Sequence, residues 1–308
     1  MKTKIYTKML LPLSLFGLLF RVLEIIYAID PENGFYYLES FIPLLFNIYI
    51  FLVIAFFISE LFLIKTESKS SRKRFGALGI PDKIIMISSA VFILGSALRD
   101  IFVESEINFS FENFTDLLLD TRFYILVFAV LTCVFIVFFA SDPKRYSVNS
   151  VMAILSLSLT FYYLLRLFTR FLDLNEILSK AYSTHTILLL GFIVLSCLNF
   201  SKILAGLRVR KYFVAFGHCA VFLSVLHLAE FVMHFLPGNP YNITVDSIFS
   251  YIADFLVSFL IFRFIQLVSN KQDKKDKNAA AKDGPTVELK ENTEEAVLDD
   301  NEIKTDNN

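Results

Sequence analysis

The chain has 308 residues, of which 56% are hydrophobic and only 19% are charged, with 35 Phe and no Trp. Its mean hydropathy is +0.60, which is too apolar for an ordinary soluble domain. The net charge of −1 leaves no basic excess to neutralise phosphates. The composition therefore excludes a secreted disulfide scaffold, a disordered protein and a nucleic-acid-binding protein, and indicates a polytopic membrane protein.

Eight windows have the length of about 20 mostly apolar residues that a helix needs to cross a bilayer. They cover residues 8–28, 41–64, 83–104, 121–140, 149–171, 185–204, 212–236 and 245–268. The first window follows a Lys-rich start, as a signal peptide does, but Arg21 and Glu24 interrupt it and no clear cleavage site follows. It is therefore interpreted as a span, and the predicted fold is all-α, a bundle of eight transmembrane helices.

Basic residues alternate between the connections of these spans. They concentrate at the N-terminus and in the second, fourth and sixth connections, whereas the first, third and seventh contain no Lys or Arg. By the positive-inside rule, both termini are predicted to be cytoplasmic, in a multi-pass protein of the plasma membrane.

The C-terminal tail differs in composition from the rest. We expect an eight-span domain over residues 1–269 and a disordered cytoplasmic tail over residues 270–308, because the tail has too little apolar content to form a core. Its Lys-rich beginning either flanks the last span or lies against anionic lipid headgroups. The tail is also a candidate binding segment for a cytoplasmic partner.

The outward-going spans share a recurring basic position. The strings LFGLLFRVLE, ILGSALRDIF, TFYYLLRLFT and FLSVLHLAEF align Arg21, Arg99, Arg166 and His227. We infer four helical hairpins in a parallel arrangement, which is a hairpin repeat.

Charged residues inside the spans are the main functional signal. A charge at the centre of a span costs about 2.5–3.5 kcal/mol on insertion scales, so it persists mainly when it is paired or functional. Arg21 and Glu24 share a helix face and are expected to pair. The adjacent Arg99 and Asp100 are expected to point apart and to find partners on neighbouring helices. Arg166 requires an acidic neighbour or an anionic ligand.

These residues are predicted to form one polar layer in the outer half of the bundle, with Asp254 facing His227. The layer contains Arg21, Glu24, Asn47, Arg99, Asp100, Arg166, His227, Glu230 and Asp254. A pocket open to the outside explains their common depth, and fixed interhelical bridges are the alternative. His185 and Arg263, near the ends of spans, are expected to reach toward water. His218 is expected to be a packing residue.

A metal site is a further alternative. His227, Glu230 and His234 lie on one helical stripe and are of the types that bind zinc, but their spacing is not HExxH and extends over two turns. Cys133, Cys197 and Cys219 fall in different spans without a CxxC motif. No nucleotide or catalytic motif occurs, so neither a metal nor another cofactor is expected.

Three functional classes remain. The first is a transporter or permease for a small polar or anionic solute, with Arg21, Arg99 and Arg166 as binding cations and Glu24, Glu230 and Asp254 as counter-charges or proton sites. The second is a membrane-embedded receptor or accessory protein with an outward-facing polar pocket. The third is an intramembrane enzyme that uses His227, Glu230 and Asp254. The transporter class is preferred because small multi-span proteins with buried charges and no soluble domain most often move a solute. The expected partners are the lipid bilayer and the solute, and no nucleic acid.

Overall fold

The computed structural model describes residues 2–29, 36–37, 40–63, 78–104, 120–141, 149–177, 183–234 and 245–282. Eight helices make up this part of the chain, and within it the only strand-like contact is a bridge between Ile29 and Tyr36. Each helix contains a segment of at least 20 residues that is apolar enough to cross a membrane. The prediction of an all-α protein with eight transmembrane helices is confirmed.

The helices follow the predicted spans in chain order. They are α1 (Lys2–Ala28), α2 (Ile42–Leu63), α3 (Ile80–Glu104), α5 (Thr121–Ser141), α7 (Ser150–Ile177), α8 (Ser183–Leu204), α9 (Arg210–His234) and α10 (Val245–Lys282). Helix α10 continues beyond residue 269 into the segment predicted to be disordered. The extension contains Ala279, Ala280 and Ala281, and Ala is the strongest helix former, which an argument from low apolar content does not measure. Residues 283–308 lie outside the described part of the chain.

Local capping sets several helix ends. The side-chain oxygens of Asp120 and Asn149 each accept a hydrogen bond from the backbone N–H two residues later at 2.9 Å, as N-cap residues do. Helix α8 ends in a Schellman motif, in which the N–H of Leu207 donates to the carbonyl of Lys202 at 2.9 Å. Gly206 adopts a φ of 84° there, a conformation that side chains disfavour. These contacts build the short connection between α8 and α9.

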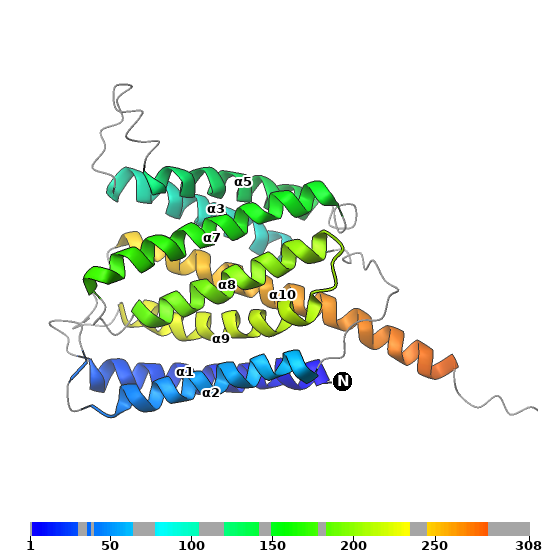
Figure 1. Cartoon of the computed structure of the whole chain (residues 1–308), viewed down its shortest axis with the longest axis horizontal. Helices are drawn as coiled ribbons and strands as arrows, with labels where there is room; N and C mark the ends of the chain where they lie inside the picture. The colour runs from blue at the N-terminus through cyan, green and yellow to red at the C-terminus, as the bar shows by residue number, and fades with distance from the viewer. Residues whose placement is uncertain are drawn as a thin grey trace, which may run out of the picture.

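Six helices close into a ring. Helix α3 packs against α5, α5 against α7, α7 against α8, α8 against α9, α9 against α10, and α10 against α3 again. Helices α1 and α2 pack against each other and against α9, so this hairpin lies outside the ring, along the side formed by α9 (Figure 1). Helix α9 therefore belongs to both groups, and its span is the most buried of the eight. The packing of α1 on α2, α3 on α5, α7 on α8 and α9 on α10 agrees with four hairpins, whereas the repeat itself stays a prediction.

Helix α1 approaches α9 closely at one point. A Cβ added to Gly17 would lie 2.7 Å from Cδ2 of Leu226, which is too short for two carbon atoms in contact. The absence of a side chain at Gly17 thus lets the α1–α2 hairpin dock tightly on α9.

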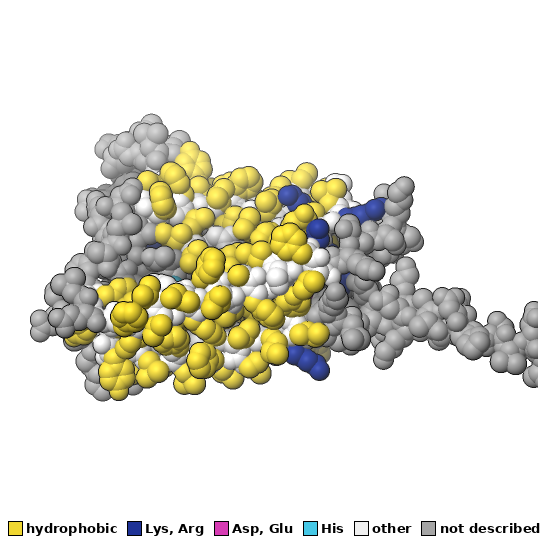
Figure 2. Space-filling view, turned by 60° about the horizontal axis from the view of Figure 1, so that its bottom comes forward, with side chains coloured by type: hydrophobic (Ala, Val, Ile, Leu, Met, Phe, Trp, Pro, Cys, Tyr) yellow, Lys and Arg dark blue, Asp and Glu magenta, His cyan; other side chains and the backbone are white. Residues whose placement is uncertain are grey.

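Apolar side chains cover the outside of the bundle. Figure 2 shows hydrophobic side chains over most of the visible flank, and Phe51, Phe102 and Ile154 are 67–70% exposed. Lys and Arg gather toward one end in the same view, the end at which Figure 1 places the N-terminus. Such a surface is stable in lipid and not in water. The protein is therefore a multi-pass integral membrane protein.

The interior of the ring is apolar toward this N-terminal end. Five buried phenylalanines meet there, and we call them the phenylalanine plug: Phe135, Phe139, Phe200, Phe213 and Phe264. The ring of Phe139 on α5 lies 6.0 Å from that of Phe200 on α8 and 5.9 Å from that of Phe264 on α10, and the rings of Phe200 and Phe264 stack at 4.8 Å. Because α5 is not next to α8 or α10 in the ring of helices, these contacts cross its interior.

Candidate functional site

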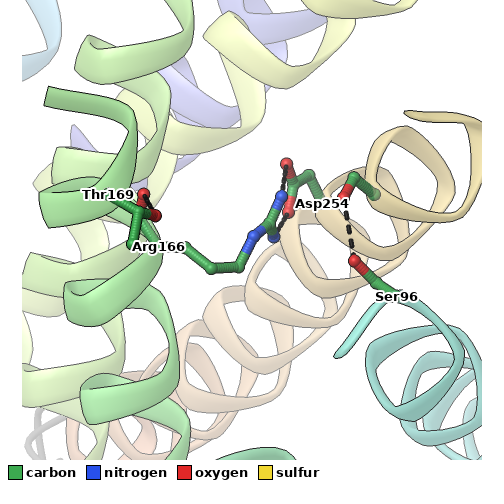
Figure 3. Close-up of polar contacts among 5 residues, drawn as sticks. Ser96, Arg166, Thr169 and Asp254 are labelled. Carbon is green, nitrogen blue, oxygen red and sulfur yellow. Dashed lines mark hydrogen bonds and ion pairs between the residues drawn. The ribbon is translucent and has the colours of Figure 1, made fainter. Parts of the chain in front are cut away.

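A buried ion pair crosses the interior of the six-helix ring. Nη1 of Arg166 on α7 lies 2.6 Å from Oδ1 of Asp254 on α10, and Nη2 lies 3.3 Å from Oδ2. The two side chains are only 9% and 2% exposed. Figure 3 shows the extended Arg166 side chain reaching from α7 to Asp254. Helices α7 and α10 stand on opposite sides of the ring, so this pair joins them through its centre.

Two tyrosines surround the guanidinium. The ring centroids of Tyr162 and Tyr163 lie 5.6 and 5.5 Å from its central carbon, within the range of cation–π attraction. Both side chains are fully buried. They precede Arg166 by four and three residues, a spacing that places all three side chains on one helical face. The hydroxyl of Tyr163 has no hydrogen-bond partner among the described atoms.

Helix α10 presents a polar stripe to the same region. Ser250, Asp254 and Ser258 are four residues apart and share one face. The hydroxyl of Ser250 lies 2.8 Å from that of Ser96 on α3 (Figure 3). Ser258 is buried, and its hydroxyl has no partner among the described atoms. The site is therefore built by α3, α7 and α10 together.

This arrangement can bind an anion. A guanidinium offers a planar fork of donors that matches a carboxylate or phosphate, and here Asp254 occupies the fork. Ser250, whose hydroxyl contacts that of Ser96, lies one helical turn before Asp254, and the ring of Tyr163 lies beside the guanidinium. A hydroxyl can either donate or accept a hydrogen bond. An anion that replaced Asp254 would thus meet both charge and hydroxyl donors.

Arg21 and Glu24 pair as predicted, but outside the ring. Nη1 of Arg21 lies 2.5 Å from Oε2 of Glu24, and both side chains are almost fully buried. Tyr36 donates its hydroxyl to Oε1 of Glu24 at 2.7 Å. Burial raises the pKa of Tyr36 well above its usual value, and the charge of Glu24 adds to this rise. The guanidinium of Arg21 also lies 5.6 Å from the ring centroid of Phe46. This group ties α1 to α2 and to the segment that joins them.

Two expectations about polar side chains require correction. His185 was expected to reach toward water, but it is 7% exposed and its Nε2 lies 3.3 Å from Oδ1 of Asn47, because α2 supplies a polar partner next to α8. Arg99 and Asp100 were expected to point apart. Nη1 of Arg99 lies 3.3 Å from Oδ1 of Asp100, because the flexible arginine side chain folds back over its neighbour.

His227 faces α10, whereas the predicted approach of His227 to Asp254 stays a prediction. Its ring stacks on that of Tyr251, with centroids 4.3 Å apart. The side chains of Glu230 and His234 lie outside the described part of the structure, so the metal hypothesis for this stripe stays a prediction. Among the side chains that are described, no group of three His, Cys, Asp or Glu residues could hold a metal ion.

The structure also contains two polar contacts that the sequence analysis missed. Arg263, which was expected to reach toward water and is 35% exposed, also binds Asp82 of α3 through two nitrogens, at 2.8 and 3.2 Å. The fully buried His218 is bonded through Nδ1 to Oε2 of Glu60 at 2.8 Å. Glu60 was visible as an isolated acid within an apolar run, a signal that required a buried partner.

No protein-family model matches the chain, and neither a curated protein nor a solved structure is significantly similar to it. The function is therefore inferred from the geometry of the site.

Proposed function

We propose that the protein transports a small polar or anionic solute, with Arg166 as the binding cation and Asp254 as its exchangeable counter-charge. The supporting observation is the buried Arg166–Asp254 pair in the interior of the six-helix ring. Pairs that only hold two helices together are expected between ring neighbours, as Asp82 of α3 and Arg263 of α10 illustrate. The Arg166–Asp254 pair instead occupies the space through which a solute would pass.

Two anions compete for the guanidinium of Arg166, namely the carboxylate of Asp254 and the solute. A buried guanidinium without a counter-charge is strongly unfavourable. Arg166 therefore binds either Asp254 or the solute, and solute binding releases Asp254 to take up a proton or to turn toward the hydroxyl of Ser250 or Ser258. This exchange couples solute binding to a rearrangement of α10.

Entry takes place from the end of the bundle opposite the N-terminus. The phenylalanine plug closes the interior at the N-terminal end, whereas the ion pair lies beyond it. Passage requires these aromatic rings to separate. We place the N-terminal end on the cytoplasmic side of the plasma membrane, because Lys and Arg gather there (Figure 2). The solute then enters from outside.

The other predicted cations receive different roles. Arg21 is paired with Glu24 in the α1–α2 hairpin outside the ring, so we assign it to hairpin structure and not to solute binding. Arg99 and Asp100 are 16% and 19% exposed, and we place them along the entry path. No role is proposed for Glu230.

Sided cysteine labelling tests the proposal. Ser96→Cys and Ser258→Cys are introduced separately into a variant without the three native cysteines. A membrane-impermeant thiol reagent is then applied from each side of the membrane in turn. Val91→Cys, on the same helix as Ser96 and 61% exposed to lipid, is the matched control that stays unlabelled. Leu207→Cys, in the exposed connection between α8 and α9, reports which side is cytoplasmic.

Alternating access predicts that both interior positions are labelled from both sides. Phe200→Ala, which removes a ring of the plug, is expected to speed labelling of Ser258→Cys from the cytoplasmic side. Labelling from outside alone contradicts transport and favours the receptor or the enzyme. Absence of labelling at both positions contradicts all three and leaves a dry bundle in which the Arg166–Asp254 pair is a structural bridge.

A further inference from the structure

A second buried charged group lies between the α1–α2 hairpin and α9, on the side of the bundle that carries the N-terminus. His218 and Glu60 are both 0% exposed. Nδ1 of His218 lies 2.8 Å from Oε2 of Glu60, and Nε2 lies 3.3 Å from the hydroxyl of Thr7 on α1. The ring of Phe57 covers the imidazole at 5.5 Å between centroids. Three helices thus meet at one imidazole–carboxylate dyad.

We infer that Glu60 and His218 form a proton-binding site that joins the α1–α2 hairpin to the six-helix ring. This inference does not rest on the proposed transport function, because proton binding requires no solute. When the imidazole of His218 is neutral, the dyad carries the single negative charge of Glu60. One added proton at Nε2 makes the imidazole positive, so that the net charge of the dyad becomes zero.

The hydrogen-bonding groups around the dyad accommodate both protonation states. A hydroxyl both donates and accepts, so Thr7 can donate to a bare Nε2 and accept from a protonated one without a change of position. The Nδ1 proton stays on the bond to Glu60 in both states. Only one proton enters or leaves, and no other bond changes.

Glu60 can accept hydrogen bonds in addition to the one from His218. Its second oxygen, Oε1, is buried and has no hydrogen-bond partner among the described atoms. An unpaired carboxylate oxygen in an apolar surrounding is strongly unfavourable, so this oxygen is available to accept a further hydrogen bond. A larger cation such as Na⁺ fits less well, because Glu60 is the one described carboxylate here and the imidazole nitrogens are already engaged.

Other titratable or charged groups occur toward the same end of the neighbouring helices. Among the described side chains they include Tyr6 and Lys8 of α1, Arg210, Lys211, Tyr212 and Cys219 of α9, Lys202 of α8 and Arg263 of α10. The hydroxyl of Tyr6 is bonded to Ser59 at 3.2 Å, and Arg263 is bonded to Asp82. Cys219 is next to His218 in the chain. Glu60 and His218 are the carboxylate and the imidazole that contact each other at this level.

The site matters for function because of its position. His218 lies on α9, which belongs to the ring, whereas Glu60 and Thr7 lie on the docked hairpin. A change of net charge at this contact changes the attraction between the two parts of the molecule. The hairpin is thereby sensitive to pH on the side of the membrane that faces the N-terminus.

Nitrogen NMR of the histidine rings tests this inference. The full chain, labelled with ¹⁵N-histidine, is studied by solid-state NMR in phosphatidylcholine bilayers, and His218→Gln assigns the resonances of His218 among the four histidines. In the wild type, Nε2 of His218 is expected to change between its bare and its protonated resonance as the pH of the sample is lowered from alkaline to acidic in a series of measurements. In Glu60→Gln, the proton affinity of His218 falls about tenfold or more, because an opposite charge in contact has been removed.

Glu24→Gln is the matched control. It removes another fully buried carboxylate, on α1 and paired with Arg21, and leaves the titration of His218 unchanged. Unaltered resonances of His185 and His227 show that each variant is folded. A His218 resonance that stays constant over the whole pH series in the wild type contradicts the inference without any variant. Equal proton affinity in the wild type and in Glu60→Gln contradicts it as well. Neither result bears on the labelling of Ser96 and Ser258.

Discussion

Removal of one partner of the Arg166–Asp254 pair is expected to cost far more stability than removal of both. In Asp254→Asn, the guanidinium stays in the interior of the ring at a residue only 7% exposed, without a counter-charge. In Arg166→Gln, the carboxylate of Asp254, 2% exposed, is left alone instead. In the double variant both charges are absent, and the two amides can bond to each other.

The magnitude follows from the burial and geometry of the pair. Breaking a buried pair by removing one partner costs about 3–5 kcal/mol, and loss of the cation next to two tyrosines adds about 0.5–2 kcal/mol in Arg166→Gln. Two hydrogen bonds, at 2.6 and 3.3 Å, hold the pair, and Asp254→Asn removes at least one of them because the amide NH2 cannot accept. We expect the double variant to be more stable than the sum of the single effects predicts, by about 2 kcal/mol or more.

Unfolding in mixed micelles of increasing dodecyl sulfate content measures these differences. Circular dichroism is the suitable signal, since the chain contains no Trp. Arg263→Gln is the control, because Arg263 is 35% exposed and an exposed pair contributes about 1 kcal/mol or less. An Asp254→Asn variant as stable as Arg263→Gln, together with additive single effects, would refute the assignment of a buried, tightly coupled pair.

Two further predictions concern packing and pH. A Cβ at Gly217 would lie 2.6 Å from Cδ1 of Ile265, so Gly217→Ala is expected to lower the free energy of unfolding by about 1–3 kcal/mol through overpacking. Gly191→Ala, with no atom within 4 Å of the new Cβ, is expected to be neutral or up to about 1 kcal/mol stabilising in the same assay. The raised pKa of Tyr36 means that the folded chain retains its phenol proton above about pH 10, where the unfolded chain loses it. The stabilisation is therefore present below about pH 10 and is lost as the pH rises further. Tyr36→Phe, which loses the bond to Glu24, is expected to be less stable than the wild type by about 1–3 kcal/mol at neutral pH. Melting experiments at a series of pH values measure this difference in stability. If the difference does not shrink between pH 7 and strongly alkaline conditions, the assignment is contradicted.

Much of the fold could be predicted from composition and length alone. Each span is long and apolar enough to be predicted without reference to the other spans, and all eight predicted spans coincide with helices. The Arg21–Glu24 pair was predictable for a similar reason, because both residues lie on one helix and its geometry determines that they meet. The tyrosines beside Arg166 were predictable in principle by the same spacing.

Contacts between helices could not be derived in this way. Arg166 and Asp254 are 88 residues apart, and Glu60 and His218 are 158 apart. In a soluble helix the apolar face points to the core, but in a membrane helix the lipid-facing and the helix-facing sides are both apolar. Phe51 and Phe57 lie on the same helix, and the first is 70% exposed to lipid whereas the second is fully buried. The sequence by itself thus determined which segments span the membrane and which charges require partners. Only the tertiary structure decided the rotation of each helix and its neighbours, and with them the ion pair across the ring and the dyad on α9, because that choice depends on the simultaneous packing of all eight helices.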